Sequence, residues 1–512
     1  MLTAQDTAGE APPAPALKPI FITEYRVEGA KQLGRVDVES AVYPFMGPER
    51  TTDDIEKARA ALEKAYKDKG YQTVTVEVPQ QLGQRGIIIL KVVENKVGRL
   101  RVKGSRFFDL DHIKRQAPSL AEGTVPNFND VTRDIVALNT LADRRITPAL
   151  RPGVEPGTVD IDLNVKDTFP LHGNVELNNR SSPDTTDLRL NAGLNYNNLW
   201  QLGHSIGASF QISPQDRNEV EVLSGYYIAR FPKVNWLSLL LNATKQNSNV
   251  STLGGVAVSG RGEVVGGRLL VTLTPKKNFY HSLSVGLDYK NFRQLVQLGA
   301  GTALDTPTAY YPWNLGYNAT WASKNAVTEL GTNLVYGVRG MERDRAQFEN
   351  SRFRADSNFF YLRGELAHTQ TLPGGTEIYG KVQGQLADQP LISSEQYSGG
   401  GLGTVRGYLE AEATGDSGVF GSLEVRSPSL LGWAPKVGEW RVYGFVEGGT
   451  LTLHEPLPEQ DGHFRLASVG VGSRVRLFDH LGGSVDLGLP LITQSKTKAH
   501  EPHVTFRVWA DF

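Results

Sequence analysis

The chain has 512 residues with 54 basic and 55 acidic side chains, so its formal net charge is −1 and no overall basic field indicates a nucleic-acid partner. Only 39% of the residues are hydrophobic, the mean hydropathy is −0.30, and no run approaches the roughly 18 apolar residues that a membrane-spanning helix needs. Cysteine is absent, which excludes disulfide frameworks and thiolate metal sites.

The first 19 residues are small, polar and rich in proline, and they show no helical pattern. This composition predicts a flexible, extended leader over residues 1–19. The leader also lacks the apolar core of a signal peptide.

Residues 20–168 contain two copies of one unit. In the first copy, Thr51 and Asp54 match a capping box, and the helix that follows keeps its apolar residues at helical spacing as far as Gly70. The continuously apolar segment 86–93, "GIIILKVV", predicts the central strand of a small sheet. We therefore predict domains over 20–96 and 97–168, each a sheet covered by two helices.

From residue 169 onward, the helical patterns give way to alternation of apolar and polar side chains. The segment 281–292, "HSLSVGLDYKNF", is an example. Strands of about ten residues with this alternation are typical of a transmembrane β-barrel, with the apolar face toward lipid. A large soluble sandwich would also alternate, but it accounts less well for the strand length, the glycine content and the final Phe512.

The barrel is expected to be wide. At roughly 20 residues for each strand with its turn or loop, residues 169–512 accommodate about 16 antiparallel strands. A barrel of this width has an aqueous lumen unless something fills it. Aromatic residues near the segment ends are expected to form girdles at the membrane interfaces: Trp200, Tyr226, Tyr227, Trp236, Tyr310, Tyr311, Trp313 and Trp509.

The segment 398–418, "SGGGLGTVRGYLEAEATGDSG", combines many glycines with a single arginine, Arg406. Glycines let a loop turn sharply close to a wall, and a guanidinium offers a planar charged fork to a carboxylate. The segment lacks the Lys-Ser/Thr pair and the following helix of a phosphate-binding loop. These residues alone fit either a solvated surface loop or a loop held inside another structure, and both stay open at this point.

The whole arrangement after the leader resembles the TpsB transporters of two-partner secretion, outer-membrane barrels with polypeptide-transport-associated (POTRA) domains. The most specific points of resemblance are "TVRGY" (404–408), "YGFVEGG" (443–449) and "VRSP" (425–428). The resemblance implies that a loop-tip motif enters the lumen, with the residues Val405, Arg406, Gly407 and Tyr408. It also implies that the arginine meets the acidic residue of a strand motif, here Phe445, Glu447 and Gly449, with glutamate in place of the usual aspartate.

The resemblance implies an outer-membrane pore that recognises an unfolded partner through periplasmic POTRA domains and translocates it to the cell surface or medium. The partner would be a TpsA-type exoprotein: an adhesin, a haemolysin or a contact-dependent toxin. A barrel-assembly factor and a passive porin are the alternatives, and a soluble carbohydrate-active β protein ranks last. We expect a monomer in outer-membrane lipid, exported by a signal peptide that this chain does not show.

No catalytic, cofactor or metal site is predicted. The ten histidines lack metal-ligand spacing, and no nucleophile elbow or dinucleotide fingerprint occurs in its required context. The chain is therefore not expected to be an enzyme.

Two edge strands could instead capture an extended polypeptide by β-augmentation. Their residues are Thr73, Val74, Thr75 and Val76 in the first unit, and Arg145, Ile146 and Thr147 in the second. Pro148 and nearby charges could equally guard the second edge against aggregation, and both interpretations stay open.

Overall fold

The computed structural model describes residues 19–81, 86–231, 234, 236–251, 258–298, 302–344 and 346–512. The predicted leader, residues 1–19, lies outside this part of the chain except for its last residue. The chain divides into two compact units, Met1–Phe169 and Pro170–Phe512. Among the described residues, no helix is long and apolar enough to cross a membrane.

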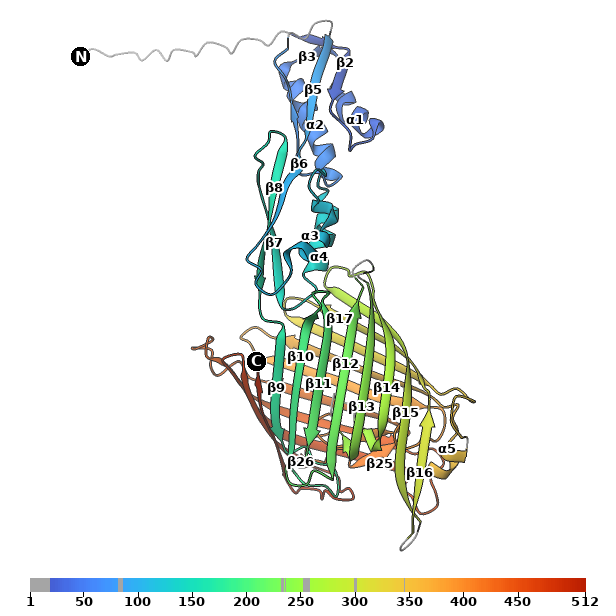
Figure 1. Ribbon diagram of the computed structural model, residues 1–512. Helices are drawn as coiled ribbons and strands as arrows, with labels where there is room; N and C mark the ends of the chain where they lie inside the picture. The colour runs from blue at the N-terminus through green and yellow to red at the C-terminus, as the bar shows by residue number, and fades with distance from the viewer. Residues whose placement is uncertain are drawn as a thin grey trace, which may run out of the picture. The chain divides into compact units, whose positions relative to one another are not determined.

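The first unit begins with a small α/β repeat (Figure 1). Its elements are β1 (Ile20–Ile22), β2 (Glu24–Glu28), α1 (Arg35–Val42), a 3-10 turn (Tyr43–Phe45), β3 (Gly47–Arg50), α2 (Thr52–Asp68), β4 (Val74–Glu77) and β5 (Ile87–Glu94). The sheet order is β2-β5-β4, so the apolar strand β5 is central, as predicted. The predicted capping box at Thr51 and Asp54 is confirmed at the start of α2.

The second repeat has strand-helix-helix-strand-strand order, which the first repeat also follows apart from its added β1–β3 pair. Its elements are β6 (Lys96–Lys103), α3 (Leu110–Arg115), a 3-10 turn (Pro118–Leu120), α4 (Phe128–Leu138), β7 (Arg144–Pro152) and β8 (Thr158–Asp167). The sheet order is β6-β8-β7. Each repeat has its own apolar core beneath its sheet, around Leu62 and Leu90 in the first repeat and around Ile113 and Leu163 in the second.

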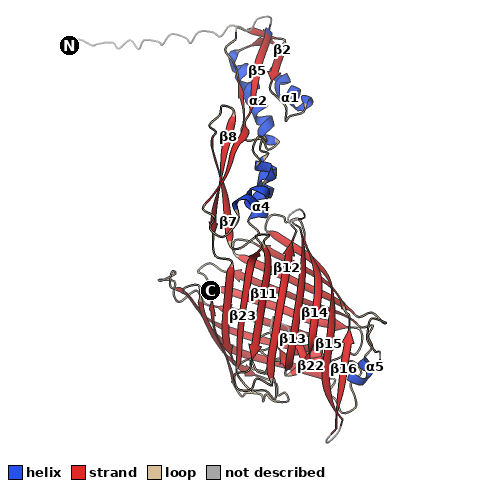
Figure 2. Cartoon of the chain, viewed as in Figure 1, coloured by secondary structure: helices blue, strands red, loops and turns tan. Residues whose placement is uncertain are grey.

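The second unit is a closed antiparallel barrel (Figure 2). Its strands are β9 (Leu171–Asn178), β10 (Arg189–Leu199), β11 (His204–Ile212), β12 (Val220–Arg230), β13 (Leu237–Ser251), β14 (Val258–Thr272), β15 (Phe279–Leu298), β16 (Thr302–Tyr310), β17 (Trp313–Ala322), β18 (Ala326–Tyr336), β19 (Phe360–Thr371), β20 (Glu377–Ala387), β23 (Ser417–Arg426), β24 (Gly438–Thr452), β25 (His463–Leu477), β26 (Leu481–Pro490) and β27 (His503–Asp511). The ring closes where β27 pairs with β9.

Two of these segments form one interrupted strand. Both β16 and β17 pair with β15, and the interruption between them covers Tyr311 and Pro312, where the proline lacks the N–H that a continuous ladder needs. Counting them once gives 16 barrel strands among the described residues, which confirms the predicted barrel.

The side chains of the barrel divide by strand face as the alternation predicts. The outward-facing Leu194, Val285 and Val471 are 55%, 43% and 59% exposed, whereas the inward-facing Asp288 is only 2% exposed. The prediction was wrong for Tyr310, which is 2% exposed in an internal aromatic cluster and not at an interface, because the connection that follows β18 folds over it.

The barrel has short turns at one end and long connections at the other. The connection between β18 and β19 carries α5 (Ala346–Ser351), and the connection between β20 and β23 carries β21 (Tyr397–Gly399) and β22 (Ala413–Gly415). This second connection contains the predicted inward loop.

Candidate functional site: the inward loop and its arginine

The inward loop is a hairpin whose root is formed by β21 and β22, which pair antiparallel. Three glycines beyond the root have positive φ: Gly400 at 107°, Gly401 at 82° and Gly407 at 96°. Side chains rarely adopt this backbone conformation, so the glycines permit the sharp turns that the sequence predicted. At Gly400 a Cβ would also lie only 2.3 Å from the carbonyl oxygen of Leu409.

The loop tip lies directly on the barrel wall. Gly407 faces Gly488 of β26, and a Cβ added to Gly488 would lie 2.6 Å from the Gly407 nitrogen. Neither residue could carry a side chain without displacing the tip, because the neighbouring atoms are backbone. This close approach brings the Arg406 side chain into contact with β23, β24 and β26.

The Arg406 guanidinium is surrounded by three carboxylates from three strands. Its Nε and Nη2 donate to Glu447 Oε1 at 3.0 and 2.7 Å, Nη2 donates to Glu424 Oε2 at 2.9 Å, and Nη1 donates to Asp486 Oδ1 at 2.8 Å. The Arg406 backbone N–H also donates to Glu447 Oε2 at 2.7 Å. All four side chains are at most 6% exposed, so these charge-assisted bonds form out of contact with bulk water.

Aromatic rings complete the surroundings of the arginine. Its guanidinium carbon lies 3.6 Å from the centre of the Phe445 ring, within the range of a cation–π contact. The Tyr443 hydroxyl donates to Asp486 Oδ1 at 2.9 Å, and Ser422 donates to Glu447 at 2.9 Å. Both hydrogen bonds hold a carboxylate in position for the arginine.

The other tip residues anchor the loop on either side of the arginine. Val405 is fully buried in an apolar cluster with Phe420 and Leu451. The Tyr408 hydroxyl lies 2.8 Å from the carbonyl oxygen of Ile492 and 3.0 Å from that of Ala467. A phenylalanine at this position could not make these bonds.

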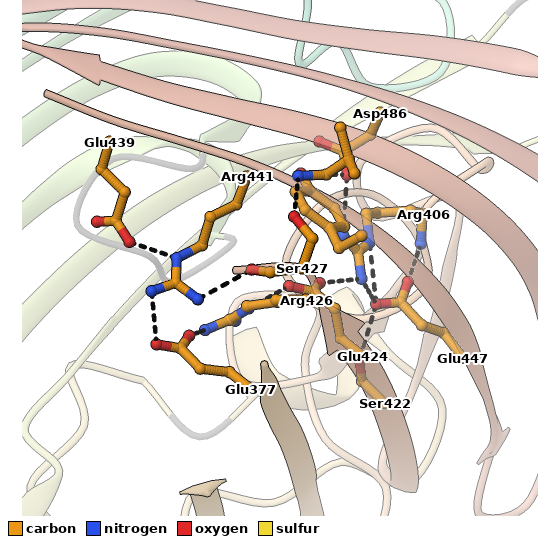
Figure 3. Close-up of polar contacts among 12 residues, drawn as sticks. Glu377, Arg406, Ser422, Glu424, Arg426, Ser427, Glu439, Arg441, Glu447 and Asp486 are labelled. Atoms are coloured by element: carbon orange, nitrogen blue, oxygen red, sulfur yellow. Dashed lines mark hydrogen bonds and ion pairs between the residues drawn. The ribbon is translucent and has the colours of Figure 1, made fainter. Parts of the chain in front are cut away.

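Ion pairs continue from the arginine along the lumen wall (Figure 3). Glu424 also accepts from Arg426 Nε at 2.6 Å, and Arg426 Nη1 lies 3.5 Å from Glu377. Glu377 in turn lies 3.1 Å from Arg441, which pairs with Glu439. The arginine site is therefore one end of a ladder of alternating charges on β20, β23 and β24.

The inward loop does not fill the lumen. A polar cavity of about 670 Å³ lies between the loop and the opposite wall. Its wall side includes Arg268 of β14, Asn318 of β17 and Glu365 of β19, and its loop side includes Thr404 and Glu410.

The structure brings together most of the residues predicted for the barrel site. Arg406, Phe445 and Glu447 are in direct contact, and Gly449 leaves room for the Phe420 ring, whose Cδ1 would lie 2.3 Å from an added Cβ. Sequence reasoning missed Glu424 and Asp486. The available signal was an acidic residue at a lumen-facing position of a predicted strand, but many strands carry such a residue.

The predicted capture strands lie at sheet edges, and they differ in how their outer edge is covered. β7 forms one edge of its sheet, but the side chain of Asn139 bonds both backbone groups of Ile146, accepting from its N–H at 2.7 Å and donating to its C=O at 3.0 Å. Pro148 removes the next N–H on that edge. On β4, Arg59 donates to the Val76 carbonyl at 3.3 Å, and the Val74 N–H donates to the Tyr71 carbonyl at 3.4 Å.

A closed 16-stranded barrel that encloses a glycine-rich arginine loop, preceded by two small α/β repeats, defines an outer-membrane barrel of the POTRA-plus-barrel class. The family described as "Haemolysin secretion/activation protein ShlB/FhaC/HecB" matches residues 157–475, and "POTRA domain, ShlB-type" matches residues 20–95. The chain belongs to this haemolysin secretion/activation family, and the resemblance to TpsB transporters is confirmed.

Individual relatives are more distant. The chain is 22% identical to the heme/hemopexin transporter protein HuxB of Haemophilus influenzae over 73% of its own length and 66% of that protein. It is 24% identical to the outer membrane transporter CdiB of Escherichia coli over 91% of its own length and 78% of that protein. The solved structure of CdiB from Escherichia coli aligns with a TM-score of 0.69 at 19% identity, covering 99% of this chain and 93% of that chain, which shows the shared fold.

Proposed function

We propose that this protein exports an unfolded partner protein across the outer membrane. The two repeats would lie in the periplasm and recognise the partner, and the partner would then cross the barrel lumen and fold outside the cell. The observation that carries the proposal is the inward arginine loop in a barrel whose lumen keeps a polar cavity of about 670 Å³.

Mixed charge in the cavity suits a polypeptide as cargo. Arg268 and Arg363 line it together with Glu329 and Glu365, and backbone-like amides line it at Asn318. A surface of balanced charge with many hydrogen-bonding groups can exchange contacts with a passing chain without holding any one segment tightly. No ATP is available at the outer membrane, so folding of the exported chain outside would provide the driving force.

We propose β4, with residues Thr73, Val74, Thr75 and Val76, as the main strand for partner capture. An extended partner segment would add to this edge through backbone hydrogen bonds. At β7, the residues Arg145, Ile146 and Thr147 are the second candidate, which the Asn139 cap disfavours. The partner class is a large secreted exoprotein such as an adhesin, a haemolysin or a contact-dependent toxin, and the transporter would act as a monomer.

Family membership favours export over the two rival functions. A barrel-assembly factor or a passive porin would not be expected to match a haemolysin secretion/activation family over residues 157–475. A passive porin would also have no use for the two N-terminal repeats.

Co-expression with a partner exoprotein tests the proposal. Full-length transporter should release the partner into the medium, and a variant lacking residues 20–168 should retain the partner in the periplasm while its barrel still reaches the outer membrane. Equal release by both forms would show that the repeats do not recognise the partner, and no release by the full-length form would contradict export itself.

A further inference from the structure

Three long connections of the barrel meet at one ion pair whose carboxylate is buried and whose arginine is 15% exposed. Arg352, just after α5, donates to both carboxylate oxygens of Asp416 at 2.9 and 2.8 Å. The same guanidinium donates to the carbonyl oxygens of Leu391 at 3.1 Å and His454 at 2.9 Å. The pair therefore joins the β18–β19, β20–β23 and β24–β25 connections.

The carboxylate of this pair is completely buried and well supplied with donors. The side chain of Asp416 is 0% exposed, and it accepts backbone N–H groups from Leu391 at 3.0 Å and His454 at 2.7 Å. Gln396 donates to it at 3.2 Å. A buried polar network in which each group has a partner specifies one arrangement of the segments that it joins.

An apolar cluster packs the β18–β19 and β20–β23 connections against the barrel strands. Phe292, Tyr310 and Tyr361 project from the barrel strands, and they pack with Phe348 and Phe359 of the β18–β19 connection. This cluster lies on the lumen side of the wall, because Phe292 occupies the same strand face as the inward-facing Asp288.

A second buried carboxylate fastens the β20–β23 connection to the wall. Glu395 is 1% exposed and lies 2.6 Å from Lys290 Nζ, and the Tyr361 hydroxyl donates to it at 2.7 Å. We define residues 337–344, 346–359, 388–396 and 453–462 as the outer layer. The three connections are neighbours in the ring order, and the outer layer packs on lumen-facing side chains of β15 and β19, so it lies inside the long-loop mouth along this part of the barrel.

We propose that Arg352 and Asp416 form a latch that holds the outer layer closed, separately from the Arg406 site, and that this latch must open for a polypeptide to leave the lumen. Asp416 follows the root of the inward loop, but neither residue belongs to the loop tip, and none of the Arg406 contacts involves them. The inference rests on the proposed export function, but its first test needs no partner and can fail independently.

The first test is single-channel recording of Arg352→Met in a planar bilayer. Methionine is unbranched but shorter than arginine, and it lacks the charge and the donors, so the frequency of opening should rise at least about tenfold. The loss of one partner from a buried ion pair usually changes an equilibrium by more than tenfold. Arg352→Lys, which keeps the charge, should lie between Arg352→Met and wild type. Wild-type opening in Arg352→Met would overturn the latch.

A matched control is available two residues away. Arg354 also pairs across the outer layer, with Glu455 at 2.6 Å, but both side chains are well exposed. Exposed pairs contribute little, so Arg354→Met should leave the opening frequency near wild type. If the opening frequency of Arg354→Met rose as much as that of Arg352→Met, the effect would not be specific to the Arg352–Asp416 pair. That result would overturn the proposed latch.

The second test holds the outer layer closed in a folded protein. Arg354→Cys and Glu455→Cys, joined by a short reducible cross-linker, would tie the β18–β19 and β24–β25 connections together. Export of a partner should fall at least about tenfold and recover on reduction, whereas each single cysteine variant treated with the same reagent should export normally. Unchanged export by the cross-linked form would overturn the proposal, and absent export in every form would instead count against the proposed function.

Discussion

Arg406 forms ion pairs with three buried carboxylates, more than any other described residue of the inward loop. One guanidinium holds Glu424, Glu447 and Asp486, each at most 5% exposed, so its removal would leave three carboxylates without their shared cation. The loss of one partner from a buried ion pair typically costs about 3–5 kcal/mol, which is enough to displace the loop tip.

We therefore expect Arg406→Ala to reduce partner export at least about tenfold while the barrel stays folded, because the barrel strands keep their own ladders. The measurement is the fraction of partner in the medium, normalised to the amount of transporter in the outer membrane. Arg406→Lys should recover only part of the export, since an ammonium cannot match the fork that reaches all three strands. Normal export by Arg406→Ala would contradict the role of the loop.

The contact between Gly407 and Gly488 allows a test that leaves every charge in place. Gly488→Ala puts a Cβ 2.6 Å from the Gly407 nitrogen, so the loop tip must shift and export should fall severalfold. Gly483→Ala on the same strand is the control, because its Cβ would meet only an ordinary contact at 3.6 Å. Equal export by the two variants would show that the tip does not depend on this contact.

Among the residues of the arginine site, those that lie in short motifs could be predicted from the sequence. Arg406 and Glu447 could be predicted because each lies in a recognisable run of neighbours. Glu424 and Asp486 could not, because every barrel strand alternates polar residues into the lumen. Only the strand register decides which of them reaches the arginine.

Among the structural elements, those with a strong local signal were predicted best. The capping box at Thr51 and the apolar run of β5 each mark an element by neighbouring residues alone. The short β1–β3 pairing and the interruption between β16 and β17 were not predicted, because three-residue strands and strand breaks depend on pairing with distant segments.

The two edge strands should differ in hydrogen exchange when a partner segment binds. An N-terminal fragment of the partner should slow amide exchange over residues 73–78, because β-augmentation places a new strand on β4. Residues 144–148 should show little change, since Asn139 already bonds Ile146 and Pro148 has no amide proton. The reverse pattern would assign capture to β7 and contradict the choice of β4.

For the whole molecule, the central feature is a wide barrel with one of its own connections folded into the lumen. The ring of 16 strands among the described residues would leave an open channel, but the inward loop occupies part of the lumen and borders a cavity of about 670 Å³. The barrel class and its approximate size could be predicted from the alternation, and the inward loop from the resemblance that the motifs at 404–408 and 443–449 carry. The outer layer could not, because its ion pair and aromatic cluster join segments far apart in the chain.

Single-channel conductance of the purified protein in a planar bilayer tests the central claim most directly, with and without the N-terminal fragment of a partner exoprotein. A gated polypeptide pore predicts low, flickering conductance in wild type, larger openings in Arg406→Ala, and block of those openings by the fragment. Steady conductance that neither the substitution nor the fragment alters would contradict the account and indicate a passive channel.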